Sequence, residues 1–401
     1  MLYYLMNKDT PVLSFTHKND HPLSDEGYFE IVETFGTLPF NFKDIGYWIK
    51  CRKGSNYNRN LRDIMFKARI TNDLEYITKT HAASTNDTIW IKSESENKAW
   101  NDVSLFRNDF TSVISEHCFE GCSIRENIGE LHSPELSCEG SFRKMFKREP
   151  CTGQFDSDIY IYKRGNPEGE ESPCNFEPYS EMLASEIANI ISPDNAVRYE
   201  LHRIDGAPAT KCNLFTSEQL GLVTYRNART KDSHLINDIA AFYTERGFEQ
   251  QFREMLVIDS LCFNYDRHTS NFGLLYDTET MQIIRPTPIF DLNNTLFPTV
   301  TVDDLKQIGD KLFYMEPKIG EDFTRTGQLA LNDSIREKLD NMRDFSFSFR
   351  GDDLFSEERV GLLENIVRKQ IEALLSGKKL TTEEVFPMSN AARKRFEEDY
   401  N

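Results

Sequence analysis

The sequence lacks any apolar run of about 20 residues, the length that a membrane-spanning helix needs. Its first residues, MLYYLMNKD, do not combine a basic segment with a longer apolar one, so we expect no secretory signal peptide. No internal repeat is apparent either. These absences predict a chain without a membrane span that works in the cytoplasm.

Positive charge is also in short supply. The 47 Lys and Arg residues are outnumbered by 65 Asp and Glu residues, which gives a formal net charge of −18. Proteins that bind nucleic acids need clustered Lys and Arg to meet the phosphates, so we expect no direct nucleic-acid contact. The acidic balance favours solubility instead. A local exception is the basic patch at positions 143, 144, 147 and 148.

The cysteines are few and scattered, at positions 51, 118, 122, 138, 151, 174, 212 and 262. Without a secretory signal we expect them to be reduced thiols. His117, Cys118 and Cys122 form the one cluster that resembles a metal site. Two or three ligands fall short of the four that a structural zinc ion takes, so we interpret them as ordinary thiols.

Residues 1–128 carry all three tryptophans, at positions 48, 90 and 100. Because Trp is a large core or interface residue, this part is expected to be a folded accessory module and not a tail. Its role does not follow from the sequence. Within it we predict strands over 44–49 and 88–91 and helices over 61–68 and 105–114.

Residues 129–216 have the pattern of a small, mostly β lobe. The segment 136–146 predicts a strand, a turn with Gly140, and a second strand. Such a turn can direct backbone N–H groups at phosphate oxygens, although a single glycine also fits an ordinary hairpin. The strands over 197–204 and 209–215 form another hairpin, which leads through Leu214 and Phe215 into the rest of the chain.

One strand of this lobe places a lysine on its apolar face. Ile159, Ile161 and Lys163 alternate and so share one side of the strand. An unpaired ammonium there would be costly, whereas a phosphate and a carboxylate would supply partners. Glu177 and Glu181, four residues apart on the helix predicted over 177–188, are both candidates for the carboxylate. The alternatives are a lysine that reaches water and a solvated acidic helix end.

The second half, residues 217–401, contains the strongest chemical signal. A buried helix over 248–263 leads into a polar loop with Asp266 and Asn271, and a hairpin follows before Asp291. Three oxygen-bearing side chains at the ends of one hairpin suit Mg²⁺ and phosphoryl transfer. The five-residue spacing alone also fits an ordinary polar turn. Further on we predict an irregular segment over 296–311 and helices over 335–342 and 359–375.

The segment Asn264–Gly273 resembles the N-x-D-R-H-x-x-N-F motif of the HipA-like serine/threonine kinases. The resemblance extends over roughly residues 130–380, with support from the sequences IYK at 161–163, EPYSE at 177–181 and LFT at 214–216. Residues 1–128 look like the variable N-terminal extension of clostridial members. The resemblance implies an α+β, bilobal protein-kinase-like fold, with a small mostly β N-lobe and a helical C-lobe after an N-terminal α/β accessory module.

The resemblance implies roles for the residues at the motif positions. Asp266 would be the catalytic base, Asn271 and Asp291 would hold Mg²⁺, and Lys163 would bind the phosphates of ATP. Glu177 would pair with Lys163, with Glu181 as the alternative. Asp266 is followed by Arg-His where ordinary protein kinases have His-Arg before the Asp, and Asp-Leu-Asn replaces Asp-Phe-Gly at 291–293.

The resemblance also assigns nucleotide-binding positions. Gly140 and Ser141 would lie in the loop that covers the phosphates, with Ser141 as a candidate autophosphorylation site. Leu214 and Phe215 would belong to the connector whose backbone meets the adenine edge. His268 would be a further nucleotide-binding residue.

The function that this implies is an ATP- and Mg²⁺-dependent protein serine/threonine kinase capable of autophosphorylation. Its partners would be ATP, a protein substrate and an antitoxin-like protein. Two alternatives stay open: a kinase-fold enzyme that phosphorylates a small hydroxyl compound or a phosphoinositide, and a non-catalytic nucleotide-binding module.

Overall fold

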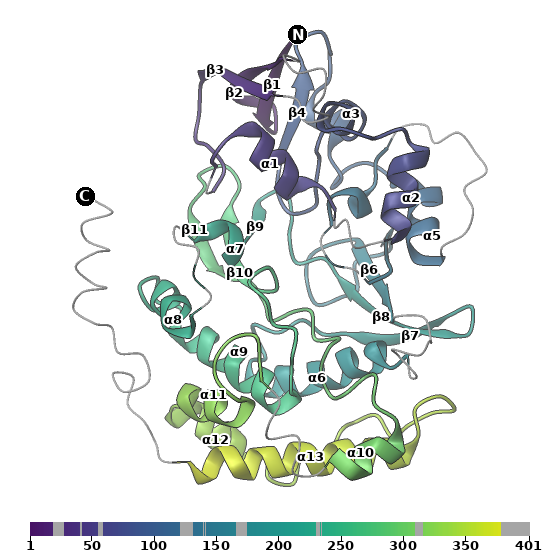
Figure 1. Ribbon diagram of the computed structural model, residues 1–401, viewed down its shortest axis with the longest axis vertical. Helices are drawn as coiled ribbons and strands as arrows, with labels where there is room; N and C mark the ends of the chain where they lie inside the picture. Colours follow the sequence, from purple (N-terminus) through teal and green to yellow (C-terminus); the bar gives the residue numbers. More distant parts are fainter. Residues whose placement is uncertain are drawn as a thin grey trace. The chain divides into compact units, whose positions relative to one another are not determined.

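The computed structural model describes the residues 1–18, 28–40, 42–54, 59–120, 131–138, 140, 142–165, 175–229, 233, 235–308 and 316–377 (Figure 1). The described part of the chain contains both helices and strands, with the strands in three sheets and the last four elements all helical, which confirms the expected α+β class. The chain divides into two compact units. The first comprises Met1–Asn166, Lys211–Val223 and Leu274–Arg285, and the second Pro167–Thr210, Thr224–Gly273 and Pro286–Asn401.

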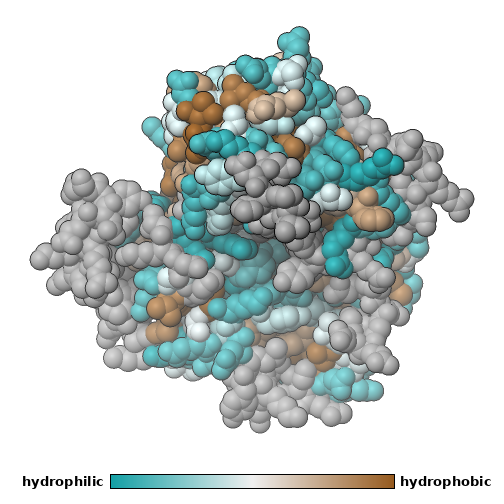
Figure 2. Space-filling view, turned by 45° about the horizontal axis from the view of Figure 1, so that its top comes forward, coloured by the Kyte–Doolittle hydropathy of each residue, from teal (hydrophilic) through white to brown (hydrophobic). Residues whose placement is uncertain are grey.

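The first unit begins with a four-stranded sheet of order β3-β2-β1-β4. Its strands β1 and β2 pair antiparallel, as do β2 with β3 and β1 with β4. Apolar side chains on β3 are exposed, Tyr28, Ile31 and Val32 among them, and Figure 2 shows hydrophobic surface over this region. The strands are β1 (Leu2–Asn7), β2 (Thr10–Lys18), β3 (Tyr28–Thr34) and β4 (Ile89–Ser93), the last confirming the strand predicted over 88–91.

Helices pack against this sheet, and two of the sequence predictions for them are wrong. The segment 44–49 is not a strand but the start of α1, because the Asp44 side chain accepts the Tyr47 N–H at 2.7 Å and caps the helix. The helix predicted over 105–114 starts only at Ser112, since Ser104 Oγ accepts the Phe106 N–H and so competes with helical bonding. The helices are α1 (Ile45–Arg52), α2 (Arg59–Lys67), α3 (Asp73–Thr80), α4 (Trp100–Val103) and α5 (Ser112–Glu120).

A second sheet has the order β5-β6-β8-β7. The strand expected near residue 136 is wrong, because Pro134–Ser137 forms a 3-10 turn whose Glu135 carboxylate accepts the Phe146 N–H at 2.9 Å. The β7–β8 hairpin is confirmed; its turn residues Asp205 and Gly206 both have positive φ. The strands are β5 (Lys144–Arg148), β6 (Ile159–Arg164), β7 (Glu200–Ile204) and β8 (Ala207–Asn213).

The hairpin predicted after the polar loop with Asp266 and Asn271 is also confirmed. It consists of β10 (Gly273–Asp277) and β11 (Ile283–Pro286), and with β9 (Leu220–Thr224) it forms a three-stranded sheet of order β11-β10-β9. Asp277 Oδ1 accepts the N–H groups of Glu279 and Thr280, which fixes the turn.

The second unit is mostly helical. Its helices are α6 (Glu177–Ile191), α7 (Tyr225–Ala228), α8 (Ile236–Thr244), α9 (Glu249–Cys262), α10 (Val302–Ile308), α11 (Phe323–Ala330), α12 (Asp333–Asn341) and α13 (Glu357–Ser376). The prediction of an irregular segment over 296–311 is wrong where α10 forms. There Thr301 Oγ1 accepts the Asp304 N–H and caps the start of the helix. In the described part of the chain, no helix has the length and hydrophobicity to cross a membrane.

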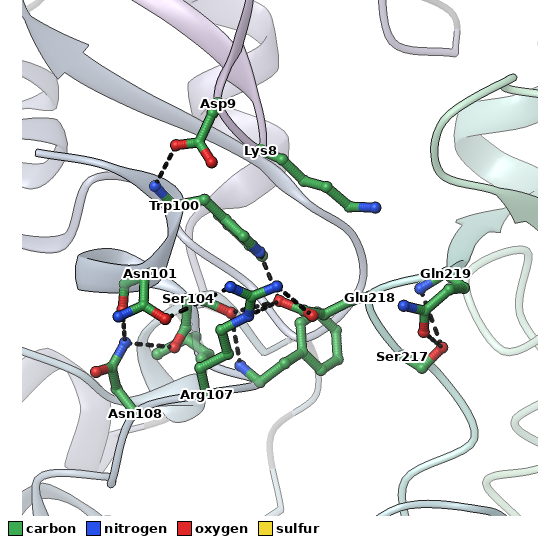
Figure 3. A network of polar contacts seen from close by, with 12 residues as sticks. Lys8, Asp9, Trp100, Asn101, Ser104, Arg107, Asn108, Ser217, Glu218 and Gln219 are labelled. Atoms are coloured by element: carbon green, nitrogen blue, oxygen red, sulfur yellow. Dashed lines mark hydrogen bonds and ion pairs between the residues drawn. The ribbon is translucent and has the colours of Figure 1, made fainter.

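A polar network within the first unit joins the N-terminal module to the connector (Figure 3). The carboxylate of Glu218, four residues after Leu214, accepts the Trp100 indole N–H at 2.5 Å and the Arg107 Nε and Nη2 groups at 2.7 and 2.9 Å. Partial burial opposes ionisation of Glu218, but these donors outweigh it and lower its pKa. The segment after the connector is therefore held by residues from α4 and the loop that follows it.

Replacing Glu218 by Gln should destabilise the protein by about 1 to 3 kcal/mol at pH 7, because charge-assisted hydrogen bonds are lost. The stabilisation by a carboxylate of lowered pKa is complete above the ordinary value of about 4.3 and disappears as the pH falls through the folded-state value. The difference in unfolding free energy between wild type and Glu218→Gln, measured with urea, should therefore narrow below about pH 4. A difference that stays constant with pH would contradict the ionised network.

Candidate active site

The candidate site in the second unit is built at the end of α9. The helix stops at Phe263, whose φ of +52° turns the chain sharply into the polar loop. One turn before that end, the buried Asp259 accepts a hydrogen bond from the Asn264 side chain at 2.8 Å. The helix end and the loop are thus joined by a side chain from each.

The Arg267 guanidinium is the centre of the loop. Its Nε and Nη2 atoms bond the two carboxylate oxygens of Asp259, both at 2.9 Å. Its Nη1 atom donates to the carbonyl oxygens of Asn271 at 2.9 Å and Phe290 at 2.6 Å. One side chain therefore connects α9, the far end of the loop and the residue before Asp291.

Arg267 makes these bonds almost entirely out of water, with 1% of its surface exposed. Burial disfavours its charge, but the adjacent Asp259 carboxylate and the nearby Asp291 raise the pKa of Arg267 above its usual range. A buried charge of this kind is tolerated because it is paired with a carboxylate and each of its three nitrogens donates a hydrogen bond.

Asp266 keeps a partly open carboxylate, with 29% of its side chain exposed. Its Oδ2 atom accepts the Asn294 side-chain N–H at 2.9 Å, and its Oδ1 atom forms an ion pair with Lys318. Its backbone carbonyl accepts the His268 N–H at 2.7 Å. This carboxylate is held in place by two neighbours and still reaches solvent, as a proton acceptor for a substrate hydroxyl must.

The two candidate metal ligands are fixed by the same loop. The Asn271 Nδ2 atom donates to the carbonyl of Asp266 at 3.2 Å, so the amide oxygen is the atom left to face a cation. Asp291 has a φ of +59° and its N–H donates to the Tyr199 hydroxyl at 3.1 Å. Among the described residues no group of three His, Cys, Asp or Glu side chains suits a metal, so an ion here would rely on substrate oxygens and water, as Mg²⁺ commonly does.

Both candidate glutamates of α6 are buried in the second unit. Glu177 is close enough to Tyr265 to act on it: burial, then Glu177 and Asp266, raise the pKa of the Tyr265 phenol to about 12. Glu181 accepts a hydrogen bond from the Thr210 hydroxyl at 2.6 Å. Glu177 therefore acts electrostatically on the loop that carries Asp266.

The remaining predicted residues belong to the first unit. Lys163 lies on β6 opposite Lys144 and its ammonium is 5.5 Å from the centre of the Phe142 ring. Gly140 has a φ of +97°, which favours glycine. Ser141 lies outside the described residues.

The connector residues form part of the core of the first unit. Leu214 is buried against Phe146 and Ile159, and its N–H donates to the carbonyl of Ile159 at 2.8 Å. Phe215 packs edge-on against Phe155, with ring centres 6.0 Å apart.

Sequence reasoning missed three residues that shape the site. Asp259 stood out only as a polar member of an otherwise apolar helix stripe, and that was its signal. Asn294 lies in the polar run after Asp291, where nothing marks one amide over another. Lys318 is 52 residues from Asp266 in sequence and carries no local signal.

Comparison with solved structures finds distant similarities, two of which are to a Helicobacter pylori kinase and to HipA of Shewanella oneidensis. No protein-family model and no curated protein sequence matches the chain. A Helicobacter pylori proinflammatory kinase, CtkA, is similar at a TM-score of 0.41 and 16% identity, covering 58% of this chain and 93% of its own. HipA of Shewanella oneidensis, solved with HipB and operator DNA, is similar at 0.48 and 11%, covering 96% and 100%. The likenesses are distant, so each residue's role is inferred from its own contacts.

Asp259→Ala should destabilise the second unit by about 3 to 5 kcal/mol, because Arg267 would be left buried without its counter-charge. Urea unfolding monitored by circular dichroism would measure the loss. The matched control is Asp340→Ala, which breaks the half-exposed ion pair with Arg343 and should cost less than about 1 kcal/mol. Equal effects of the two substitutions would mean that the Asp259–Arg267 pair does not organise the loop.

Proposed function

We propose that the protein is an ATP- and Mg²⁺-dependent phosphotransferase of the HipA-like type, acting as a protein serine/threonine kinase. The observation that carries the proposal is the Arg267 side chain, whose single Nη1 atom joins the carbonyls of Asn271 and Phe290. It holds the loop with Asp266 and the residue before Asp291 together in one unit. An Asp, an Asn five residues later and an Asp after a hairpin is the arrangement that phosphoryl transfer uses.

Asp266 is the proposed base. Asn294 orients one carboxylate oxygen, and the partial exposure leaves room for a hydroxyl-bearing substrate. The acceptor hydroxyl would give its proton to Asp266 as its oxygen attacks the γ-phosphorus, and ADP would leave with the electron pair of the broken bond. Most of the rate enhancement would come from positioning and charge.

Asn271 and Asp291 fit a hard cation, because both present oxygen atoms and the Asn271 amide is oriented by the bond from its nitrogen to Asp266. A bound Mg²⁺ ion would neutralise charge on the β- and γ-phosphates. Lys163 would bind the phosphate chain of ATP and pair with Glu177 or Glu181, and Leu214 and Phe215 would border the adenine. His268, whose N–H bonds the Asp266 carbonyl, would line the same site.

The acceptor is proposed to be a protein Ser or Thr hydroxyl, with Ser141 as a candidate site of autophosphorylation. A small hydroxyl compound or a phosphoinositide would use the same base and metal ligands, and a nucleotide-binding module would use the metal ligands alone. The antitoxin-like partner and the cytoplasmic location rest on the sequence resemblance.

Asp266→Asn and Asp291→Asn should each lower phosphate incorporation by about 100- to 10,000-fold, because one removes the base and the other a charged metal ligand. Asn keeps the size of each side chain and tolerates the positive φ at position 291. Intact-mass analysis after incubation with Mg²⁺ and ATP, followed by peptide mapping, measures the incorporation and tests Ser141.

The matched control for these variants is Asp303→Ala on α10, since Asp303 is a strongly exposed carboxylate in the same unit. It should retain wild-type incorporation. Undiminished incorporation in Asp266→Asn would exclude Asp266 as the base.

ATP should raise the melting temperature only when Mg²⁺ is present, and saturation at about 100 times the dissociation constant corresponds to roughly 2.7 kcal/mol of stabilisation. Lys163→Met should reduce this shift, because the phosphates lose a counter-charge. Lys147→Met, on the neighbouring strand and exposed, is the control. A shift with Mg²⁺ but no phosphate incorporation into any acceptor would favour the nucleotide-binding module, and no shift at all would exclude ATP as the ligand.

A further inference from the structure

The Lys318 ammonium forms an ion pair with Oδ1 of Asp266, the proposed base. The other oxygen of that carboxylate accepts a hydrogen bond from Asn294, and in the described part of the chain Lys318 is the cation that contacts Asp266. The motif at Asn264–Gly273 contains no lysine, so Lys318 comes from a distant part of the sequence.

The backbone that carries Lys318 is held firmly. Ile319 is buried, and Gly320 has a φ of +105°. A Cβ atom at Gly320 would lie 2.3 Å from Thr326 Oγ1, the same oxygen that accepts the Glu321 N–H at 3.0 Å. The turn after Lys318 is therefore packed directly on the first turns of α11.

Helix α11 is in turn packed on α9, as Figure 1 shows. The Ser260 hydroxyl of α9 donates to the carbonyl of Phe323, and a Cβ atom at Gly327 would lie 2.4 Å from that hydroxyl oxygen. Ser260 precedes the end of α9 by less than one turn. The same helix end thus positions both Asp266, through its loop, and Lys318, through α11.

The Lys318 side chain itself stays accessible, with 51% of its surface exposed. Ion pairs with this exposure add little to folding stability, so stability does not account for a rigid platform beneath this lysine. An accessible ammonium can exchange one anionic partner for another, whereas the buried Arg267 cannot.

We propose that Lys318 binds the phosphoryl group while it is transferred. This rests on the proposed function. The acceptor oxygen must hydrogen-bond Asp266 and attack the phosphorus from the same position, so the phosphoryl oxygens come next to whatever touches that carboxylate. The proton passes to Asp266, the new O–P bond forms, and ADP departs. Lys318 then lies next to the phosphoryl oxygens, where negative charge develops during the transfer.

The test is steady-state kinetics of phosphate incorporation with Lys318→Met and Lys318→Arg. Met keeps the length of the side chain and removes the charge. It should lower kcat on the order of 100-fold while the KM for ATP and the melting temperature stay unchanged. Arg keeps the charge and should restore most of kcat. Lys306→Met, a half-exposed lysine of α10 paired with Glu358, is the control and should behave as wild type.

The outcomes separate this inference from the proposed function. If the kcat of Lys318→Met equals that of the wild type, the role of Lys318 is overturned and the kinase assignment stays intact. Faster turnover in Lys318→Met also overturns it, since the ion pair would then be an inhibitory contact. A wild-type protein that transfers phosphate to no acceptor overturns both proposals. A fall in kcat that Arg does not restore shows a structural role instead of a charge.

Discussion

The buried pair between Arg267 and Asp259 is the interaction on which the site depends. A guanidinium out of water needs partners for its donors, and here the Asp259 carboxylate accepts from Nε and Nη2 while two backbone carbonyls accept from Nη1. Since one of those carbonyls belongs to Asn271 in the loop and the other to Phe290 before Asp291, the Nη1 donors are satisfied only when both segments are in place. The geometry of the loop and the hydrogen bonding of Arg267 therefore depend on each other.

Several residues around this pair have a strained backbone. Phe263 and Asp291, which flank the segment, both have positive φ, and so do Leu296 and Phe297 just beyond it. Such conformations persist only where the surroundings enforce them. The enforcing contacts are visible: the Leu296 N–H bonds the carbonyl of Cys262 at 2.8 Å, and the buried Arg359 donates to the carbonyl of Phe297 at 2.6 Å. The segment after Asp291 is thus tied back to α9 and to α13.

Sequence patterns predicted what periodicity and turn chemistry encode. The helices α6, α9 and α13 and the β10–β11 hairpin follow from apolar spacing and from polar turns. Short elements failed where one side chain decided them, as with the cap at Asp44 or the cap at Thr301 that starts α10. Contacts across long sequence separations, such as Lys318 with Asp266 or Trp100 with Glu218, leave no local pattern at all. The chain's bulk acidity likewise gave no sign of the cations gathered at the site.

Those cations divide into two kinds. Arg267 is buried, bonded on every side and close to two carboxylates, Asp259 and Asp291, so it sets geometry and cannot change partners during a reaction. Lys318 is half exposed and, among the described residues, forms its ion pair with the outward carboxylate of Asp266. A flexible ammonium on a rigid backbone can follow charge as it moves, because the surrounding water screens its departure from one anion and its arrival at another. The buried charge thus builds the site, and in the proposed reaction the exposed charge is the one that responds to the substrate.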